Sequence, residues 1–98
     1  MTTCSSLEEA RHIASGLIER RLAACVNIVP QVESIYRWKG EVETSTEVML
    51  VIKTTAEAFD RLRAALTQLH SYEVPECVEI PITDGSAAYL EWIGASVR

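Results

Sequence analysis

The chain has 98 residues, a length that suits one domain with one modest hydrophobic core. Its 9 Lys and Arg residues against 14 Asp and Glu residues give a formal charge of -5, which argues against nucleic acid as a partner because phosphate backbones bind basic proteins. The longest apolar run, Val48 to Ile52, is too short to cross a membrane.

The N-terminal stretch MTTCSSLEE has neither the basic nor the apolar region of an export signal, so we expect a cytoplasmic protein. The chain has three cysteines, which is an odd number, and none of them forms a CxxC pair. This predicts free thiols rather than a disulfide framework or a closed zinc site. They are Cys4, Cys25 and Cys77.

The first helix is predicted from about Ser6 to Arg21, because Ser6 and Glu9 form a capping-box pattern ahead of apolar residues at helical spacing. These apolar residues are Leu7, Ala10, Ala14, Leu17 and Ile18. Only Met1 to Cys4 remain to form a strand before this helix. The first strand is therefore expected to be cut short.

A long hairpin follows the first helix. Residues from Ala24 to Trp38 are rich in β-branched and aromatic side chains, which predicts a strand interrupted at Pro30. Lys39-Gly40 supplies a turn, and residues 41–54 run back as the partner strand. At about 3.3 Å per residue the first of these strands would span about 50 Å, against a radius of gyration of about 13 Å for a domain of this size. We therefore expect the hairpin to bend or overhang and another subunit to cover it.

The second half of the chain predicts a helix, a strand and a closing helix. Thr54 and Glu57 form a second capping-box pattern, and the helix that follows ends near His70 with a stripe of Phe59, Leu62, Leu66 and Leu69. Residues 76–82 are expected as a short strand. The last helix is capped by Asp84 or Ser86 and presents Leu90, Ile93 and Val97.

The order β-α-β-β-α-β plus a terminal helix predicts a single domain over residues 1–98. Its fold class is α+β, with the ferredoxin-like or split-βαβ arrangement and an antiparallel sheet. The run VMLVI is apolar on both faces, whereas the helices of such a unit cover only one face of the sheet. This again favours an oligomer.

The stretch HSYEVPE suggests a metal site, because the imidazole of His70 and the carboxylates of Glu73 and Glu76 suit divalent copper, zinc or nickel. The alternative for His70 is a helix C-cap, where its side chain donates to the last free carbonyl groups. Cys77 is expected to point away from Glu76 and to pack as a small hydrophobic residue.

Four aromatic residues could line a ligand cleft between subunits or could serve only to pack the interface: Tyr36, Trp38, Tyr72 and Trp92. Lys53, at the end of the apolar run, is a candidate anion contact or a partner for Glu73. A lysine at the end of a strand is also commonly a solubilising charge.

Five motifs, in order along the chain, resemble the CutA divalent-cation tolerance proteins: RLAACVNIVP, SIYRWKGEVE, VMLVIKT, HSYEVPE and YLEWI. The resemblance implies a ferredoxin-like subunit in a tight homotrimer with hairpins exchanged between neighbours, similar in shape to the PII signalling proteins. It also implies a link to tolerance of copper and other divalent metals.

This chain departs from the family pattern at several positions. Members carry more residues before MTTCSS, and their usual HPYE reads His70-Ser71-Tyr72-Glu73 here. In one branch, copper is associated with a cysteine and two adjacent histidines, and these positions hold Thr2, Leu69 and His70. Only His70 keeps the ligand type, so any bound Cu(II) or other divalent metal is expected to be held weakly.

Three functional hypotheses follow from the sequence. The first is a trimeric protein of copper and divalent-metal tolerance that binds a metal or a small ligand, and the second is a trimeric interaction scaffold with incidental metal affinity. The third is an enzyme, for which acylphosphatase is the comparison because of its similar fold and size. That chemistry needs an arginine in a glycine-rich phosphate loop, and TTCSSLEE supplies neither. We therefore predict no catalytic residues and no enzyme activity.

Overall fold

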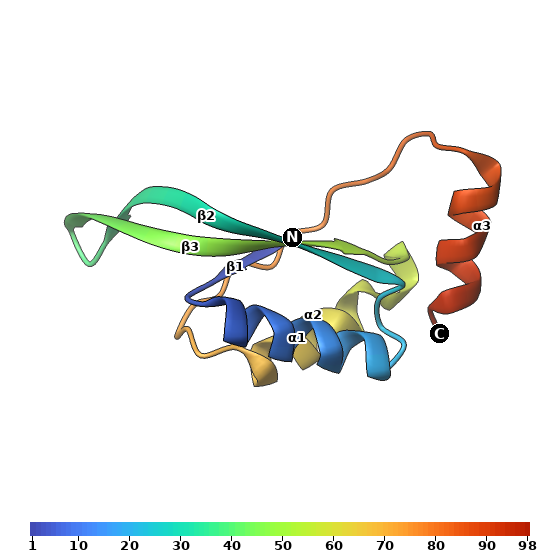
Figure 1. The fold of residues 1–98 in the computed structure, drawn as a ribbon, viewed down its shortest axis with the longest axis horizontal. Helices are drawn as coiled ribbons and strands as arrows, with labels where there is room; N and C mark the ends of the chain where they lie inside the picture. Colours follow the sequence, from blue (N-terminus) through green and yellow to red (C-terminus); the bar gives the residue numbers. More distant parts are fainter.

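The computed structural model describes residues 1–98, which form a three-stranded sheet and three α-helices (Figure 1). The strands are β1 (Thr2–Cys4), β2 (Cys25–Trp38) and β3 (Glu41–Lys53). The helices are α1 (Leu7–Glu19), α2 (Phe59–Leu69) and α3 (Ala87–Ser96), with a 3-10 turn, η1 (Ala56–Ala58), before α2. Helices α1 and α2 lie together under one face of the sheet, and α3 lies apart from them at one end. No helix is both long enough and apolar enough to span a membrane.

The sheet is antiparallel, with the order β1-β3-β2, so β3 is its central strand. The three residues of β1 pair with Val48 to Leu50 of β3. Leu50 faces the helices and is fully buried in the core. Because side chains alternate along a strand, Glu47 and Met49 lie on the opposite face of the sheet.

The predicted hairpin is present and extends well past the helices (Figure 1). Its turn has positive φ at Lys39 (50°) and Gly40 (83°), as a two-residue type I′ turn requires. The predicted interruption at Pro30 is a β-bulge between Val29 and Val32, where Gln31 has a φ of 62°. The longest dimension of the chain is 44 Å. The expected overhang is therefore confirmed.

The core lies between the sheet and the two helices beneath it. Eleven buried residues form it, among them Cys4, Leu17, Leu50 and Leu66, none of which has any exposed surface. The predicted apolar face of α1 was partly wrong, because Leu7 and Ile18 are 40% and 41% exposed while Ile13 is buried. The helix turns its Ala10, Ile13 and Leu17 side toward the sheet.

The helix ends show which cap predictions were correct. Ser6 accepts a hydrogen bond from the backbone N–H of Glu9 (3.1 Å), as predicted. The capping residue before α2 is Thr55, not Thr54, because the hydroxyl of Thr54 donates instead to the carbonyl of Leu22 (2.7 Å). Ser86 precedes α3, but its side chain makes no capping bond.

The predicted strand over residues 76–82 is absent in the single chain. Only Val78 and Met1 exchange two backbone hydrogen bonds there, of 2.9 and 3.2 Å, beside the short edge strand β1. A three-residue strand offers few partners, and Pro75 and Pro81 have no N–H to donate. Cys77 packs against the core, as predicted.

Leu17 and Ile18 are neighbours on α1 that should respond differently to truncation. Leu17→Ala should lower the free energy of unfolding by about 2–5 kcal/mol, because it leaves a cavity between α1 and the sheet. Ile18→Ala removes a similar side chain from a largely exposed position and should cost less than about 1 kcal/mol. Urea denaturation followed by circular dichroism measures both. Equal losses would contradict the described orientation of α1.

Candidate functional site

A cavity of about 300 Å³ lies between the hairpin and the loop that follows α2. Five of the residues predicted for a site line it: Tyr36, Trp38, Tyr72, Glu73 and Glu76. The sequence analysis missed the other three, Thr3, Glu47 and Val74. The cavity therefore brings together residues that were predicted for two different purposes, metal ligation and an aromatic cleft.

The strand register explains why the aromatic residues and Glu47 share this cavity. Val32 lies opposite Glu47, Tyr36 opposite Glu43, and Trp38 opposite Glu41. Paired residues of an antiparallel sheet point to the same face, so these three pairs lie on one face of the hairpin. It is the face turned away from α1 and α2. Ser45 also donates to the hydroxyl of Tyr36 (3.4 Å), so the phenol lies back toward Glu47.

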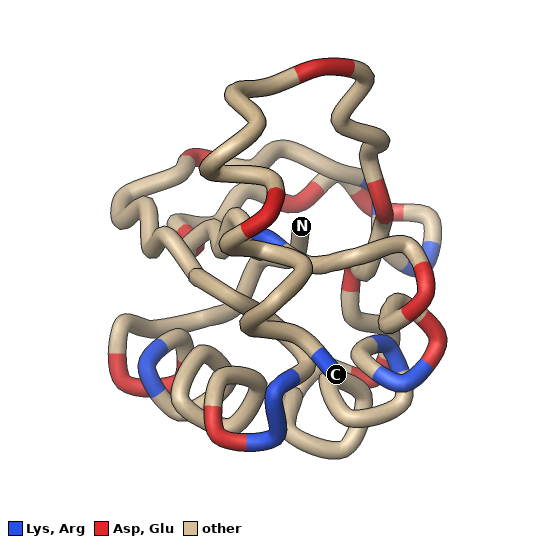
Figure 2. Tube along the Cα trace, turned by 90° about the vertical axis from the view of Figure 1, so that its right-hand side faces the viewer, with Lys and Arg blue, Asp and Glu red and all other residues tan.

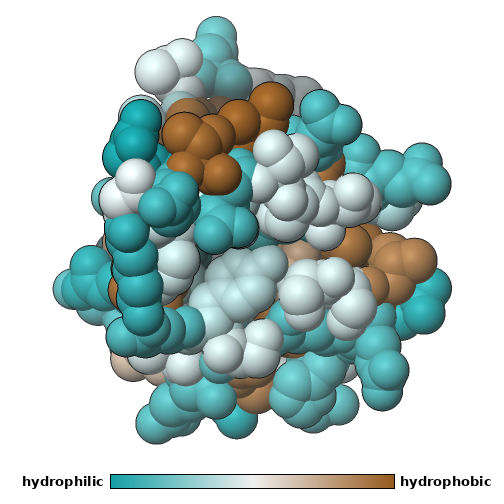
Figure 3. All heavy atoms as spheres, turned by 90° about the vertical axis from the view of Figure 1, so that its left-hand side faces the viewer, coloured by the Kyte–Doolittle hydropathy of each residue, from teal (hydrophilic) through white to brown (hydrophobic).

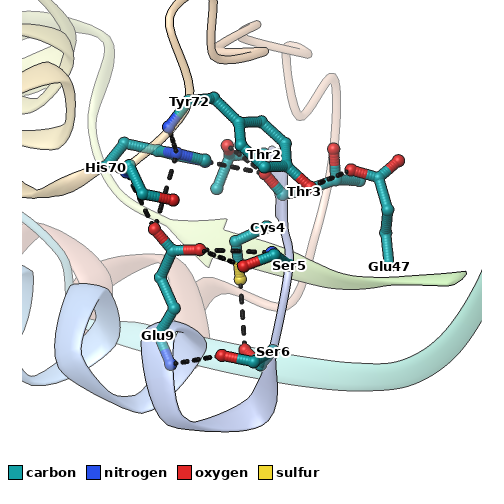
Figure 4. Close-up of polar contacts among 10 residues, drawn as sticks. Thr2, Thr3, Cys4, Ser5, Ser6, Glu9, Glu47, His70 and Tyr72 are labelled. Atoms are coloured by element: carbon teal, nitrogen blue, oxygen red, sulfur yellow. Dashed lines mark hydrogen bonds and ion pairs between the residues drawn. The ribbon is translucent and has the colours of Figure 1, made fainter. Parts of the chain in front are cut away.

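Glu47 is the most buried carboxylate of the cavity, with only 8% of its surface exposed. Its Oε2 accepts a hydrogen bond of 2.6 Å from the hydroxyl of Tyr72 (Figure 4). Burial raises the pKa of Tyr72 well above its usual range, and the hydrogen bond to Glu47 raises it further. The phenol therefore stays protonated and acts as a donor. In the sequence, the available signal was a charged residue directly before the apolar run VMLVI.

His70 lies beside Tyr72, with the ring centroids 4.7 Å apart, and it uses both of its ring nitrogens (Figure 4). Nε2 donates to the carbonyl of Thr3 (2.7 Å), and Nδ1 accepts from the backbone N–H of Tyr72 (3.1 Å). His70 is also the C-cap residue of α2, through its own backbone N–H, which donates to Leu66. The C-cap prediction is confirmed for the position. The ring, however, binds a strand carbonyl rather than the helix end.

The structure does not bring His70, Glu73 and Glu76 together as metal ligands. Glu73 and Glu76 line the cavity, but His70 does not. Nowhere in the chain do three His, Cys, Asp or Glu side chains converge closely enough to hold a metal ion. A metal at His70 would have to displace either the bond to Thr3 or the bond to Tyr72. As placed in this chain, these residues therefore do not fit a metal centre.

Two predicted site residues lie elsewhere. Lys53 contacts the side-chain oxygen of Asn27 and lines a second, largely apolar cavity of about 600 Å³ between β3, residues 78–82 and α3. It does not contact Glu73. Trp92, on α3, lies beside Tyr89 with their ring centroids 5.6 Å apart.

Glu9 anchors the loop after α2 to the start of α1. Its side chain accepts hydrogen bonds from Ser5, through the backbone N–H (3.2 Å) and the hydroxyl (2.9 Å), and from the backbone N–H of Ser71 (2.8 Å). Burial alone would raise the pKa of Glu9, but the hydrogen bonds from Ser71 and Ser5 outweigh it and lower the pKa to about 2. This carboxylate fixes the loop that carries Tyr72.

The cavity is acidic. Glu47, Glu73 and Glu76 line it, and no Lys, Arg or His does. Lys and Arg residues lie mainly in the helical layer, at the bottom of Figure 2. Seen from the hairpin end, hydrophilic residues surround apolar patches and paler residues of intermediate hydropathy (Figure 3). This arrangement favours a cationic ligand over an anionic one.

The fold defines a small α+β domain, with two helices on one face of a three-stranded antiparallel sheet and a projecting hairpin. Residues 1–96 match the family described as CutA1 divalent ion tolerance protein. The chain therefore belongs to this family.

Individual relatives agree with this assignment. The divalent-cation tolerance protein CutA of Thermus thermophilus is 52% identical over 93 residues, which are 95% of this chain and 90% of that protein. The CutA homologue of Xenopus laevis is 48% identical, and the match covers 94% of this chain but 61% of that protein. The solved structure of the Thermus thermophilus divalent cation tolerance protein superposes with a TM-score of 0.97 at 49% identity, covering 99% of this chain and 94% of that one.

Replacing Glu9 should make the free energy of unfolding less dependent on pH in the acid range. Because the pKa of Glu9 falls from 4.5 to about 2 on folding, its stabilisation is full above pH 4.5 and is lost as the pH falls toward 2. The free energy of unfolding of the original chain should fall between about pH 6 and about pH 3. Glu9→Gln should make this fall smaller by about 1–3 kcal/mol. Urea denaturation at both pH values measures this difference.

Glu8→Gln is the matched control, because it removes the same charge from the first turn of the same helix. Glu8 accepts no side-chain hydrogen bond, so this variant should keep the acid dependence of the original chain. Identical behaviour of the two variants would contradict the assigned role of Glu9.

Proposed function

We propose that the chain acts as a homotrimer in tolerance of divalent cations, and that it binds a cationic ligand in the cavity lined by Glu47. The observation that supports this proposal is the cavity itself, with three carboxylates and no basic side chain. Family membership supplies the cellular context. We propose the cytoplasm as the compartment and no enzymatic turnover.

Assembly is supported by apolar side chains that the single chain leaves in water. Ile35 and Val42 are 68% and 63% exposed. They lie on the face of the sheet that α1 and α2 cover, but on the part of the hairpin that extends beyond these helices (Figure 1). Val78, Ile80 and Ile82 are also exposed, in the segment that forms no strand. A second and third copy could cover both sets. In such an assembly, residues 76–82 would pair as the fourth strand of a ferredoxin-like sheet.

Divalent metals, copper among them, are the cations that the names of the relatives suggest. Carboxylate oxygens bind divalent ions, and Glu73 and Glu76 lie beside Glu47 in the cavity. One subunit supplies no converging set of ligands. We therefore propose weak metal binding that involves groups from more than one subunit.

The alternative is a trimeric scaffold with incidental metal affinity. One observation favours it, because both ring nitrogens of His70 already serve the fold. In that case metal ions would bind without effect on assembly, and removing the carboxylates of the cavity would leave partner binding unchanged.

A charge on the overhanging hairpin should break the assembly. Ile35→Lys should convert a trimer into monomers, because a trimer would bury this side chain and a buried unpaired charge is strongly unfavourable. Light scattering at micromolar concentration measures the mass. Ile18→Lys is the control, since Ile18 is an exposed apolar residue on α1, away from the hairpin. A monomeric original chain, or a trimer that survives Ile35→Lys, would contradict the proposal.

Metal binding is tested by calorimetry with Cu(II) and Zn(II). The original chain should bind with a Kd on the order of micromolar, and Glu73→Gln with Glu76→Gln should weaken binding by about ten-fold or more. Glu79→Gln is the control, because Glu79 lies in the same segment but lines the other cavity. His70→Ala decides whether the imidazole takes part. No binding by an intact trimer would leave the scaffold as the better explanation.

A further inference from the structure

The carboxylate of Glu47 lacks a positively charged partner. It is 8% exposed, and no Lys, Arg or His side chain lies within ion-pair distance of it. Oε2 is bound by Tyr72, whereas Oε1 has no hydrogen-bond partner in the chain and is open to solvent, because every buried side-chain oxygen or nitrogen has a partner. Oε1 can therefore accept a hydrogen bond from a ligand, and a charged N–H group is the strongest donor to a carboxylate.

Aromatic rings line the same cavity as this carboxylate. Tyr36, Trp38 and Tyr72 all line the cavity, and Glu73 and Glu76 add negative charge. The face of an aromatic ring attracts ammonium groups, and most strongly in Trp. Within this chain the Trp38 ring already does so, since the Nζ of Lys39 lies 5.7 Å from its centroid.

The cavity walls that one chain supplies do not by themselves complete a metal site. No three ligand groups converge, and aromatic rings offer a metal ion no oxygen or nitrogen in exchange for its water. At about 300 Å³ the cavity has the size of the smaller small-molecule sites. Its combination of one accessible carboxylate oxygen and aromatic walls matches a ligand with an N–H donor at one end and an alkyl chain behind it.

We infer that the cavity binds a small primary alkylammonium ion, whose N–H groups donate to Glu47 and whose carbon atoms pack against Tyr36 and Trp38. This inference rests on the proposed function in one respect, since it assigns the cation site to the same cavity. Glu73 and Glu76 attract the ion to the entrance, and Val74 contributes apolar surface.

The test uses the full chain in its assembled state, with n-butylammonium as the probe and 1-butanol as the neutral molecule of similar size. Nuclear magnetic resonance follows the backbone amide of Glu47 and the indole N–H of Trp38. Butylammonium should shift both signals and bind at least about ten-fold more tightly than butanol. Tetramethylammonium, which has no N–H, should bind more weakly than butylammonium but more tightly than butanol.

Three variants assign the effect to residues. Glu47→Gln should weaken butylammonium binding by about ten-fold or more, and Trp38→Leu by about three-fold. Glu33→Gln is the matched control, since Glu33 lies opposite Thr46 on the other face of the same hairpin, and it should change nothing. Circular dichroism checks that each variant folds. If Glu47→Gln does not fold, the butylammonium affinities of Trp38→Leu and Glu33→Gln are compared instead, and this comparison still tests the inference.

Equal binding of butanol and butylammonium, or equal effects of Glu47→Gln and Glu33→Gln, would overturn the inference. Absence of butylammonium binding by the intact assembly would also overturn it. Light scattering and Zn(II) calorimetry on the same sample keep the two proposals separate. A trimer that binds zinc but not butylammonium defeats only this inference, whereas a monomer that binds butylammonium through Glu47 defeats only the proposed assembly.

Discussion

The hydrogen bond from the ring of His70 to the carbonyl of Thr3 is the contact on which the cavity depends. It joins the end of α2 to the three-residue strand β1, which pairs on its other side with the central strand β3. The backbone N–H of Tyr72 then bonds to the other ring nitrogen, which holds the phenol over Glu47. Glu9 secures the same loop through Ser71. A structural role of this kind explains why a histidine is needed there, since it both donates and accepts.

Much of the fold could be predicted because local patterns were strong. Pro30, Lys39-Gly40 and the β-branched runs mark the hairpin, and the capping pattern at Ser6 marks the start of α1. Thr54 was a less reliable signal. A threonine can bond to a distant carbonyl as well as to a helix end, and only the tertiary structure shows that it reaches Leu22. The orientation of α1 likewise depended on which side met the sheet.

The candidate site was predictable in its residue types but not in its grouping. Aromatic residues of the hairpin and acidic residues of the later loop meet only because β1 brings the end of α2 to the central strand. Glu47 escaped notice because its only local signal, its position directly before the apolar run VMLVI, does not by itself predict burial. Its burial comes from the loop around Tyr72, which is far away along the chain. The strand expected over residues 76–82 requires a longer pairing edge than β1 offers.

The β-bulge at Gln31 determines which side chains form the wall of the cavity. Before it, paired residues run from Cys25 and Lys53 to Val29 and Met49, and after it the pairing resumes one residue later, at Val32 and Glu47. If the register of Val29 and Met49 continued along the hairpin without a bulge, Ile35 would lie opposite Glu43, and Arg37 opposite Glu41. The face that now carries a phenol and an indole would then carry an alkyl chain and a guanidinium. A shift of one position in the strand register, with no change of sequence, would thus exchange the two faces of the hairpin and put a guanidinium on the face that carries Glu47.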